Sequence, residues 1–353
     1  MDVARKMTRS VQIGGVLIGN QAPIAIQSMT NTRTEDMDAT VEQIKRLEDA
    51  GCDIVRSSIY SQECAVALRR IKQSISIPIV ADVHFDHRLA VSAIENGADK
   101  LRINPGNISR PEYISMVTDC AKAHHIPIRI GVNMGSLNSE IEAKYGRSAR
   151  ALVASAVQNV KMLEERGFYD IVISVKASNV STMVESYELL SSELDYPLHL
   201  GVTEAGDVYS GTVKNAIGIG SLLLNGIGDT VRVSLTGDPV QEIYAAKEIL
   251  RAVGSYNKGI EIISCPTCGR TRFDLEKAVS KVKEATKNIN RSLKVAIMGC
   301  VVNGPGEAKD ADIGIAGGGN GSGILFIRGE RVAVLPDEEL ISELLRRINN
   351  WQD

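Results

Sequence analysis

The sequence predicts an α/β protein in which a (β/α)8 TIM barrel is followed by a small α/β domain. Two observations favour the barrel: runs rich in β-branched residues recur eight times in residues 1–250, and a segment with helical period follows each run. Parallel strands buried on both faces give such nearly continuous apolar runs. A doubly wound open sheet is the less favoured alternative. A third observation, a change of composition near residue 251, separates the second domain.

The predicted strands of the barrel alternate regularly with predicted helices. The strands are 24–30, 53–59, 77–84, 99–104, 126–133, 170–176, 197–205 and 229–236. In the first intervening segment Val41, Ile44 and Leu47 have helical spacing and Gly51 ends the segment. Before the first strand, residues 11–19 alternate around Gly14 and Gly15, which predicts a hairpin that plugs the bottom of the barrel.

The second domain is predicted from a shorter series of elements. A strand at 260–264, a helix at 273–289 and a strand at 293–298 precede three short strands between 312 and 336 and a closing helix at 337–351. We therefore expect a barrel domain over 1–252, a linker over 253–259 and a second domain over 260–353.

Composition and charge limit the function classes. The 353 residues are 44% hydrophobic and 24% charged, as in folded globular proteins. A net charge of −3 argues against bulk attraction to nucleic acid or to an anionic membrane. The N-terminus lacks the apolar run of a signal peptide, and we expect a cytoplasmic protein with no membrane span. Its cysteines should then be reduced, so a CxxC pair favours a metal or redox site over a disulfide.

Cations lie at five predicted strand ends, where barrel enzymes build their active sites. These residues are Arg56, Arg102, Arg129, Lys176 and Arg232. Any one of them could form a rim salt bridge. Five at one mouth repel each other unless an anion neutralises them, and arginine suits bidentate phosphate binding. The pattern predicts a phosphate or diphosphate ligand.

Two carboxylates, Asp82 and Glu204, lie among these cations. A carboxylate in such a place either orients the cations or acts as a general acid or base. We expect Asp82 to orient its neighbours and Glu204 to take part in the chemistry. His84, Asn104, Asn133 and Ser234 lie at the same strand ends.

Three cysteines of the second domain form a C-x2-C-x31-C pattern, with Cys265 and Cys268 in "SCPTCGR" and Cys300 in "MGCVVNGPGEA". All five histidines lie in the barrel, so zinc lacks its usual fourth local ligand. A [4Fe–4S] cluster fits better because one iron can take an oxygen donor or stay open. Glu307, one Gly-Pro-Gly turn beyond Cys300, is the predicted fourth ligand. A thioredoxin-like dithiol is a minor alternative.

The chain resembles the 4-hydroxy-3-methylbut-2-enyl diphosphate synthase family in its two-domain bacterial form. The resemblance runs through "IQSMTNT", "GCDIVR", "ADVHF", "LRINPGN", "IRIGVN", "ISVKAS", "LGVTEAG", "SCPTCGR" and "MGCVVNGPGEA" and covers essentially the whole chain. It implies a barrel related to the pterin-binding type and a cluster domain like the iron-sulfur part of sulfite and nitrite reductases. One departure is "RSSIYSQECA" at 56–65, which is more polar than is usual in the family.

The resemblance also implies an activity and a set of roles. The family opens the ring of 2-C-methyl-D-erythritol 2,4-cyclodiphosphate reductively and removes a hydroxyl, giving 4-hydroxy-3-methylbut-2-enyl diphosphate for non-mevalonate isoprenoid synthesis. Flavodoxin or ferredoxin supplies two electrons through a [4Fe–4S] cluster. The family's cluster ligands fall on Cys265, Cys268, Cys300 and Glu307, and its catalytic glutamate on Glu204. Its diphosphate-binding residues fall on Arg56, Arg102, Arg129, Lys176 and Ser234, with Asn133 and Arg232 nearby.

The winding of a barrel predicts a homodimer. The eighth helix, at about 238–252, delivers the chain to the bottom face, opposite the active-site mouth. Because the linker is short, we expect each cluster domain to cap the barrel of a second copy in a head-to-tail dimer. Two other classes of protein fit less well. A pterin-dependent methyltransferase gives the cysteines no role, and a non-catalytic iron or zinc protein explains only the cysteines.

Overall fold

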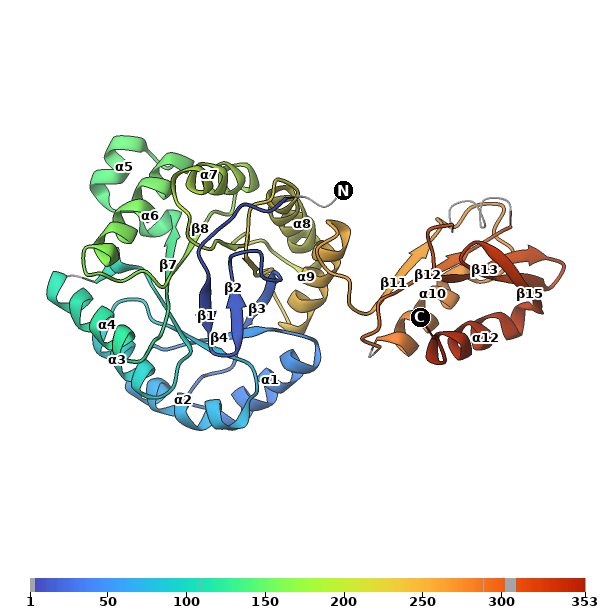
Figure 1. Cartoon of the computed structure of the whole chain (residues 1–353), viewed down its shortest axis with the longest axis horizontal. Coiled ribbons are helices and arrows are strands. Elements are labelled where there is room, and N and C mark those ends of the chain that lie inside the picture. The colour runs from blue at the N-terminus through green and yellow to red at the C-terminus, as the bar shows by residue number, and fades with distance from the viewer. Residues whose placement is uncertain (1–3, 109, 288, 302–308, 353) are drawn as a thin grey trace. The chain divides into compact units, whose positions relative to one another are not determined.

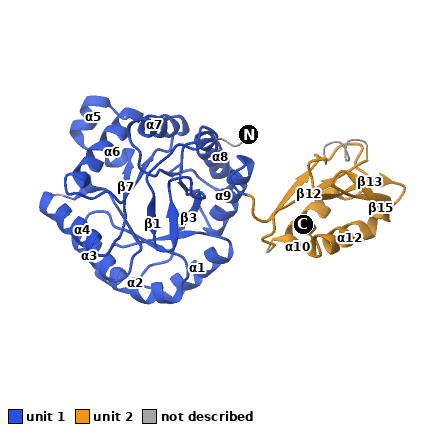
Figure 2. Cartoon of the chain, viewed as in Figure 1, with its two compact units in different colours: residues 1–256 blue, residues 257–353 orange. Residues whose placement is uncertain are grey.

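The computed structural model of the chain describes residues 4–108, 110–287, 289–301 and 309–352. It divides into two compact units, Met1–Tyr256 and Asn257–Asp353 (Figure 2). Unit 1 contains an eight-stranded sheet, and unit 2 contains a five-stranded sheet. In the described part of the chain, no helix has both the length and the apolar character needed to cross a membrane.

Unit 1 is a parallel barrel whose strands are joined in the order β8-β7-β6-β5-β4-β3-β10-β9. A bridge between Ile173 and Leu198 joins β8 to the start of β9 and closes the ring. The predicted barrel fold is confirmed. Its strands are β3 (Ala25–Met29), β4 (Ile54–Ser58), β5 (Ile79–Asp82), β6 (Lys100–Ile103), β7 (Ile128–Asn133), β8 (Ile171–Lys176), β9 (His199–Leu200) and β10 (Thr230–Val231).

Helices surround the barrel (Figure 1). Several begin where a short polar side chain accepts a hydrogen bond from a backbone amide of the first turn, as Asp36, Ser61, Ser148 and Asp207 do. The short helix α5 was not predicted. The helices are α1 (Met37–Asp49), α2 (Gln62–Ser74), α3 (His87–Glu95), α4 (Pro111–Ala123), α5 (Ser139–Tyr145), α6 (Ala149–Glu164), α7 (Val180–Glu193), α8 (Val208–Leu224) and α9 (Val240–Ala252), with 3-10 turns η1 (Pro105–Asn107) and η2 (Met134–Ser136).

The predicted N-terminal hairpin is present and closes one end of the barrel. Strands β1 (Val11–Ile13) and β2 (Val16–Ile18) pair antiparallel. Their apolar side chains pack on residues near the N-terminal ends of the barrel strands, in a cluster separate from the larger core between strands and helices. This inner cluster contains Val11, Ile13, Ile18, Ala25, Ile54, Val80 and Val172. The barrel interior therefore has an apolar floor.

Two strands are much shorter than predicted. The runs 197–205 and 229–236 contain only the two-residue strands β9 and β10. Gly201 lies so close to β10 that a Cβ atom there would be 2.4 Å from the Arg232 carbonyl oxygen. Beyond it, Glu204 and Gly206 adopt positive φ values of 54° and 109°, which extended strands do not allow. The local backbone, rather than the apolar pattern, ends these strands.

Tyr187 on α7 supports the seam where β8 and β9 meet. Its buried hydroxyl donates a hydrogen bond to the His199 carbonyl oxygen and accepts one from the Val175 amide at 3.2 Å. A side chain thus satisfies backbone groups at a junction where only one bridge joins the strands.

Unit 2 is a mixed sheet with the strand order β11-β12-β13-β14-β15. Strands β11 to β13 are parallel, and β13 to β15 are antiparallel. Apolar residues of the two described helices, α10 and α12, pack against one face of the sheet in a single cluster. The elements are β11 (Ile260–Ser264), α10 (Leu275–Thr286), β12 (Leu293–Met298), β13 (Ile313–Gly319), β14 (Ser322–Ile327), β15 (Glu330–Pro336) and α12 (Asp337–Asn349).

Candidate active site

Alternate residues of each barrel strand face the interior of the barrel, which we call the lumen. Above the apolar floor these positions become polar and cationic. Arg56, Arg102, Arg129 and Lys176 are all buried, with at most 9% of each residue exposed, and each cation interacts electrostatically with others of the set. Arg232 joins them from the residue after β10. The five predicted cations therefore meet in one place.

The cations lie at different depths, which corrects the prediction that all five occupy strand ends. Lys176 is the last residue of β8, but Arg129 is only the second residue of β7. Arg129 is consequently buried well below the mouth, where its guanidinium contacts Ser174 Oγ at 3.4 Å. Because alternate side chains of a strand share one face, Arg129 and Lys176 both face the lumen although they lie at different depths.

Asp82 at the end of β5 is shared by two of the arginines. Its Oδ1 lies 3.0 Å from Arg102 NH1 and its Oδ2 lies 3.7 Å from Arg56 Nε. His84 Nε2 is 3.6 Å from Asp82 Oδ2. Burial would raise the pKa of Asp82, but Arg56, His84 and Arg102 together lower it far below the ordinary range. Asp82 therefore stays ionised and orients the arginines, as expected.

Glu242 is a buried carboxylate at the lumen edge that sequence reasoning missed. Its Oε1 accepts hydrogen bonds from Arg232 NH2 and the Leu235 amide, both at 3.2 Å, and its Oε2 accepts one from Ser28 Oγ at 2.7 Å. It thus fixes Arg232 and the segment that carries Ser234. One signal was available: Glu242 lies on the apolar face of α9, among buried Val240, Ile243, Ala246, Ile249 and Leu250.

Two glycines make room for the cations. A Cβ atom at Gly131 would lie 2.4 Å from Arg102 Nε, and one at Gly201 would lie 3.1 Å from Lys176 Nζ. Both glycines face the lumen in strands or strand extensions where a larger residue would otherwise fill the space. The close approach of backbone and guanidinium lets Arg102 NH2 donate to the Gly131 carbonyl oxygen at 3.3 Å.

Several buried donors of this cluster have no hydrogen-bond partner in the described structure. They are Arg102 Nε, Arg129 Nε and NH2, and Arg232 Nε. The five cations outnumber the two carboxylates Asp82 and Glu242 that pair with them. Because buried polar groups are normally satisfied, this surplus of charge and donors fits an anion with several oxygen atoms.

The remaining predicted barrel residues lie on the loops that follow the strands. Asn133 ends β7 and is half-buried, and Ser234 is half-buried two residues beyond Arg232. Glu204 is exposed on the loop between β9 and α8, and its φ of 54° is an unfavourable conformation for a residue with a side chain. No ion pair to Glu204 is found within the described ranges. Its carboxylate is therefore available at the mouth.

The loop at 56–65 departs from the family pattern because it is polar. Its polar side chains make local contacts. Tyr60 OH donates to Glu35 Oε2 at 2.5 Å, Cys64 Sγ lies 3.3 Å from the same oxygen, and Ser61 caps α2. The hydrogen bond from Tyr60 is the main cause that lowers the pKa of Glu35 to about 2. These polar residues link the loops after β3 and β4.

The register of unit 2 brings the first and third cysteines of the pattern to neighbouring loops. Strands β11 and β12 pair in parallel with Ser264 opposite Ile297, so the loops that follow them lie side by side. Cys265 Sγ accepts a hydrogen bond from the Gly299 amide at 3.1 Å, and Cys300 comes next in the chain. Arg272 N also donates to the Gly299 carbonyl oxygen at 2.9 Å.

Cys268 lies on the same loop as Cys265 and is exposed. Its amide donates to Thr271 Oγ1 at 3.1 Å, and a hydrogen bond with the Arg270 backbone is the main cause that lowers the pKa of its thiol. A thiol with a lowered pKa more readily provides the thiolate that binds metal.

The side chains of these loops provide donor chemistry that fits a metal cluster. Three thiols, one of them made more acidic, are the donor set that iron-sulfur clusters use. Within the described ranges no group of three or more His, Cys, Asp or Glu side chains is close enough together to hold a metal ion. The predicted fourth ligand, Glu307, lies outside the described residues.

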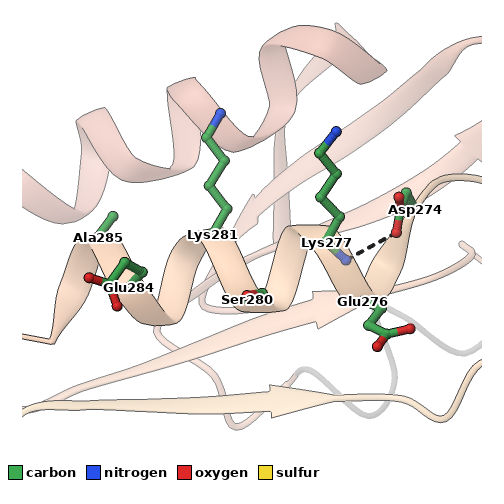
Figure 3. A pocket seen from close by; sticks show the side chains of 7 residues that line it. All are labelled: Asp274, Glu276, Lys277, Ser280, Lys281, Glu284 and Ala285. Carbon is green, nitrogen blue, oxygen red and sulfur yellow. Dashed lines mark hydrogen bonds between the residues drawn. The ribbon is translucent and has the colours of Figure 1, made fainter.

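A separate shallow pocket lies along α10 (Figure 3). Its lining mixes lysines with carboxylates and includes the capping contact from the Lys277 amide to Asp274 Oδ1 at 3.0 Å. It contains no cysteine and no buried unpartnered donor, so it does not compete with the lumen as a site. The lining residues are Asp274, Glu276, Lys277, Ser280, Lys281, Glu284 and Ala285.

A barrel with a cationic lumen, joined to a small α/β unit that carries three cysteines, defines a class of two-domain enzymes that act on anionic substrates. Comparison with known proteins agrees with this class. Residues 8–247 match the family model described as the GcpE TIM-barrel domain, and residues 261–350 match the model of the GcpE protein C-terminal domain. The chain belongs to the GcpE family, and the resemblance stated from its motifs is confirmed.

Relatives with curated names are similar over nearly their whole length. The chain is 57% identical over 345 residues to 4-hydroxy-3-methylbut-2-en-1-yl diphosphate synthase (flavodoxin) of Caldanaerobacter subterraneus, covering 98% of this chain and 97% of the relative. It is 55% identical to the protein of that name in Clostridium perfringens, covering 98% of this chain and 99% of the relative.

Solved structures agree at the level of the barrel fold. Dihydropteroate synthase from Stenotrophomonas maltophilia superposes with a TM-score of 0.52 at 14% identity, over 70% of this chain and 98% of that chain. Type I 3-dehydroquinate dehydratase from Clostridium difficile gives a TM-score of 0.52 at 15% identity, over 70% of this chain and 98% of that chain. At this identity the likeness shows the fold alone.

Proposed function

We propose that the chain converts 2-C-methyl-D-erythritol 2,4-cyclodiphosphate to 4-hydroxy-3-methylbut-2-enyl diphosphate by two-electron reduction, in isoprenoid biosynthesis. The names of relatives that are 55–57% identical over nearly the full chain support this reaction. In the structure, the observation that carries the proposal is the surplus of buried, unpartnered cationic donors in the lumen. A diphosphate supplies the oxygen atoms that these donors lack.

In this proposal Arg56, Arg102, Arg129, Lys176 and Arg232 bind the diphosphate, with Asn133 and Ser234 at the rim of the lumen. Ring opening breaks a carbon–oxygen bond and leaves an additional ionised oxygen on the diphosphate. Because Asp82 and Glu242 already fix Arg56, Arg102 and Arg232, these arginines stabilise the developing charge without first reorganising. The lumen thus binds the substrate and also favours departure of the diphosphate oxygen.

Glu204 is the proposed acid–base residue of the reaction. Its exposed carboxylate lies beyond β9, on the face of the barrel where the loops after the strands gather. Removal of a hydroxyl as water requires a proton, and a carboxyl group at the mouth can deliver it.

Cys265, Cys268, Cys300 and Glu307 are the proposed ligands of a [4Fe–4S] cluster. When bound, such a cluster supplies single electrons and an iron atom that acts as a Lewis acid. The donor set supports iron-sulfur binding, because thiolates are soft ligands and one of these thiols has a lowered pKa. A flavodoxin is the proposed electron donor, as the names of the relatives indicate, with ferredoxin as the alternative. Thiolate ligands also favour a reducing compartment, so we propose a cytoplasmic location.

A homodimer is the proposed assembly, with each cluster unit serving the barrel of a second copy. The segment between α9 and β11 is only residues 253–259, which reach roughly 25 Å at full extension. In addition, α8 exposes an apolar stripe with helical spacing, Tyr209, Val213, Ile217 and Leu224, and Tyr209 is 82% exposed. Such a stripe supports association of two chains through a shared face.

The activity is tested with the anaerobically purified chain, the cyclodiphosphate and reduced flavodoxin. Formation of the linear diphosphate by an iron-loaded brown protein is expected. An active but colourless, zinc-loaded protein would overturn the cluster, and an iron-loaded protein that leaves the cyclodiphosphate unchanged would overturn the reaction.

The assembly is tested by mixing two inactive variants, Glu204→Gln and Cys265→Ser, under conditions in which subunits exchange. A site shared between chains restores one working pair in each heterodimer. Confirmed exchange without recovered activity would contradict the shared site.

A further inference from the structure

Lys100 is a buried cation of the lumen to which the proposed function assigns no role. It lies on β6 two residues before Arg102, on the same side of the strand, and none of its surface is exposed. Its Nζ donates to Gln27 Oε1 at 3.3 Å. No carboxylate in the described structure lies within ion-pair distance of it. A fully buried lysine without a counter-ion is rare in folded proteins.

The surroundings of Lys100 oppose a positive charge from every side. Its neighbour in the sheet is Val80, which belongs to the apolar floor beneath the lumen. The charges that act on it are those of Arg129 on β7 and Arg56 on β4, and it acts in turn on His199 on β9. The lumen also contains Asp82 on β5, Lys176 on β8 and Arg232 after β10. Strand β3 contributes only the neutral amide of Gln27.

Neither carboxylate of the lumen is free for Lys100. Asp82 is shared by Arg56 and Arg102, and Glu242 is paired with Arg232. Burial, followed by the charges of Arg129 and Arg56, therefore lowers the pKa of Lys100 well below its ordinary value. The arginines remain charged whatever their surroundings, whereas a lysine in such a site releases its proton.

We infer that Lys100 is neutral in the ligand-free lumen and takes up a proton when the diphosphate binds, so that substrate binding is coupled to protonation. The inference rests on the proposed function, because it needs a dianion bound among Arg56 and Arg129. That anion reverses the sign of the local field. A protonated Lys100 then adds a further cation to the anion site, and the proton comes from solvent.

The coupling has a definite sign. Since binding favours the protonated form, substrate affinity falls as pH rises between the pKa values of Lys100 in the free and bound states. If one proton is taken up on binding, the affinity falls by at most tenfold for each unit of increase in pH. His199 is also buried, with its Nδ1 2.7 Å from Thr230 Oγ1. Its ordinary pKa of about 6.5 is already lowered by burial and these cations. Burial and the neighbouring arginines lower the pKa of Lys176 as well, so the contribution of Lys100 is the difference in proton uptake between the wild type and a variant of Lys100.

The substrate allows the protons taken up by the protein to be counted, because its own ionisation does not change in the neutral range. Each phosphorus of a cyclic diphosphate carries one ester and one anhydride bond, so its single acidic oxygen is ionised throughout the neutral range. Heat of binding is measured by titration calorimetry at pH 8 without reductant, in two buffers of different ionisation enthalpy. The difference between the buffers gives the protons taken up. We expect Lys100→Met to take up close to one proton fewer than the wild type, because any uptake by Lys176 is common to both.

The variant Lys100→Arg is a second test of the inference, because it places a fixed positive charge at the same position. It should bind the cyclodiphosphate with close to one proton fewer than the wild type, a result that a merely structural role of Lys100 would not produce. Binding without uptake in the wild type, or unchanged uptake in either variant, would overturn the inference and leave the proposed function intact. Absence of any binding by the wild type in both buffers would overturn the proposed function and this inference together.

Discussion

The barrel lumen and the cysteine loops of unit 2 each gather groups for a ligand, but they hold these groups differently. In the lumen, Arg102 is fixed by Asp82 at 3.0 Å and Arg232 by Glu242 at 3.2 Å, on strands whose register the barrel sets. In unit 2, Cys265 contacts the loop of Cys300 through the Gly299 amide, while Cys268 is exposed. Ion pairs thus fix the groups of the lumen, whereas the described contacts of the cysteine loops involve backbone amides.

The two regions also differ in how their unbound groups affect the stability of the chain. Buried cations without enough carboxylates cost stability in the ligand-free barrel, and the anion removes that cost when it binds. The cysteine thiols of unit 2, which are partly or fully exposed, cost the folded chain little, and in the proposed function metal binding orders them. Variants in the two regions should therefore affect different observables.

Replacing one cysteine of the pattern has the largest expected effect. Cys265→Ser, Cys268→Ser and Cys300→Ser should each lose the brown chromophore and all turnover, since each removes a thiolate ligand. Glu307→Ala should weaken iron retention less than a cysteine change but reduce activity strongly. Absorption spectra, iron counts and turnover measure these effects, and the serine variants should still bind the cyclodiphosphate because the lumen contains none of these residues. A serine variant with full iron content and turnover would refute the ligand assignment.

Loss of the carboxylate at the mouth has the next largest expected effect. Glu204→Gln should lower turnover by about 10²–10⁴-fold, the usual contribution of a general acid, while substrate affinity is retained. Steady-state kinetics and calorimetric binding separate the two quantities. Glu63→Gln is the control, because Glu63 lies in the first turn of α2 and outside the lumen. Equal loss of affinity and turnover in Glu204→Gln would indicate a binding role instead.

Removal of a lumen cation should change affinity and stability in opposite directions. Arg129→Met and Lys176→Met should weaken cyclodiphosphate binding by about 1.5–3 kcal/mol each, because each removes a charged hydrogen bond. The same changes should raise the melting temperature of the ligand-free chain, since a buried polar group without a carboxylate partner is replaced by an apolar chain of similar length.

Lys72→Met is the matched control for this pair. Lys72 lies on α2 and pairs with Asp99 at 2.6 Å, outside the lumen. Its replacement should leave affinity unchanged and should not raise the melting temperature. If Arg129→Met and Lys176→Met lower stability and leave affinity intact, these cations serve the fold and not the substrate.

The sequence predicts the barrel and its cations because both depend on local pattern. Period-2 alternation reports which residues share a face, so Lys176 and Arg102 could be assigned to one lumen without knowledge of the neighbouring strands. The lengths of β9 and β10 could not be predicted in this way. They depend on the contact of Gly201 with the Arg232 carbonyl oxygen, between residues far apart in the chain.

The pairing of the buried charges could not be predicted from the sequence, for a similar reason. Glu242 lies on a helix and reaches Ser28 on β3, Arg232 and the Leu235 amide together, which only the closed barrel brings within reach. The cysteine spacing, in contrast, predicts a donor set without structure. The motif gives the number of thiols, but it does not give the distances between them.

The smallest expected effect tests whether the lumen is organised by backbone space as well as by charge. A Cβ atom at Gly131 would lie 2.4 Å from Arg102 Nε and 2.8 Å from Arg102 NH2. The guanidinium is the far end of a flexible side chain, so in Gly131→Ala it should move and weaken its bonds to Asp82 and to the residue-131 carbonyl oxygen. We expect substrate affinity to fall by about 1 kcal/mol, the value of one hydrogen bond, with little change in melting temperature. Gly135→Ala is the matched control, since Gly135 lies just beyond the same strand and a Cβ atom there would meet nothing within 4 Å. Equal affinities of the two alanine variants would mean that the position of Arg102 is set by Asp82 alone.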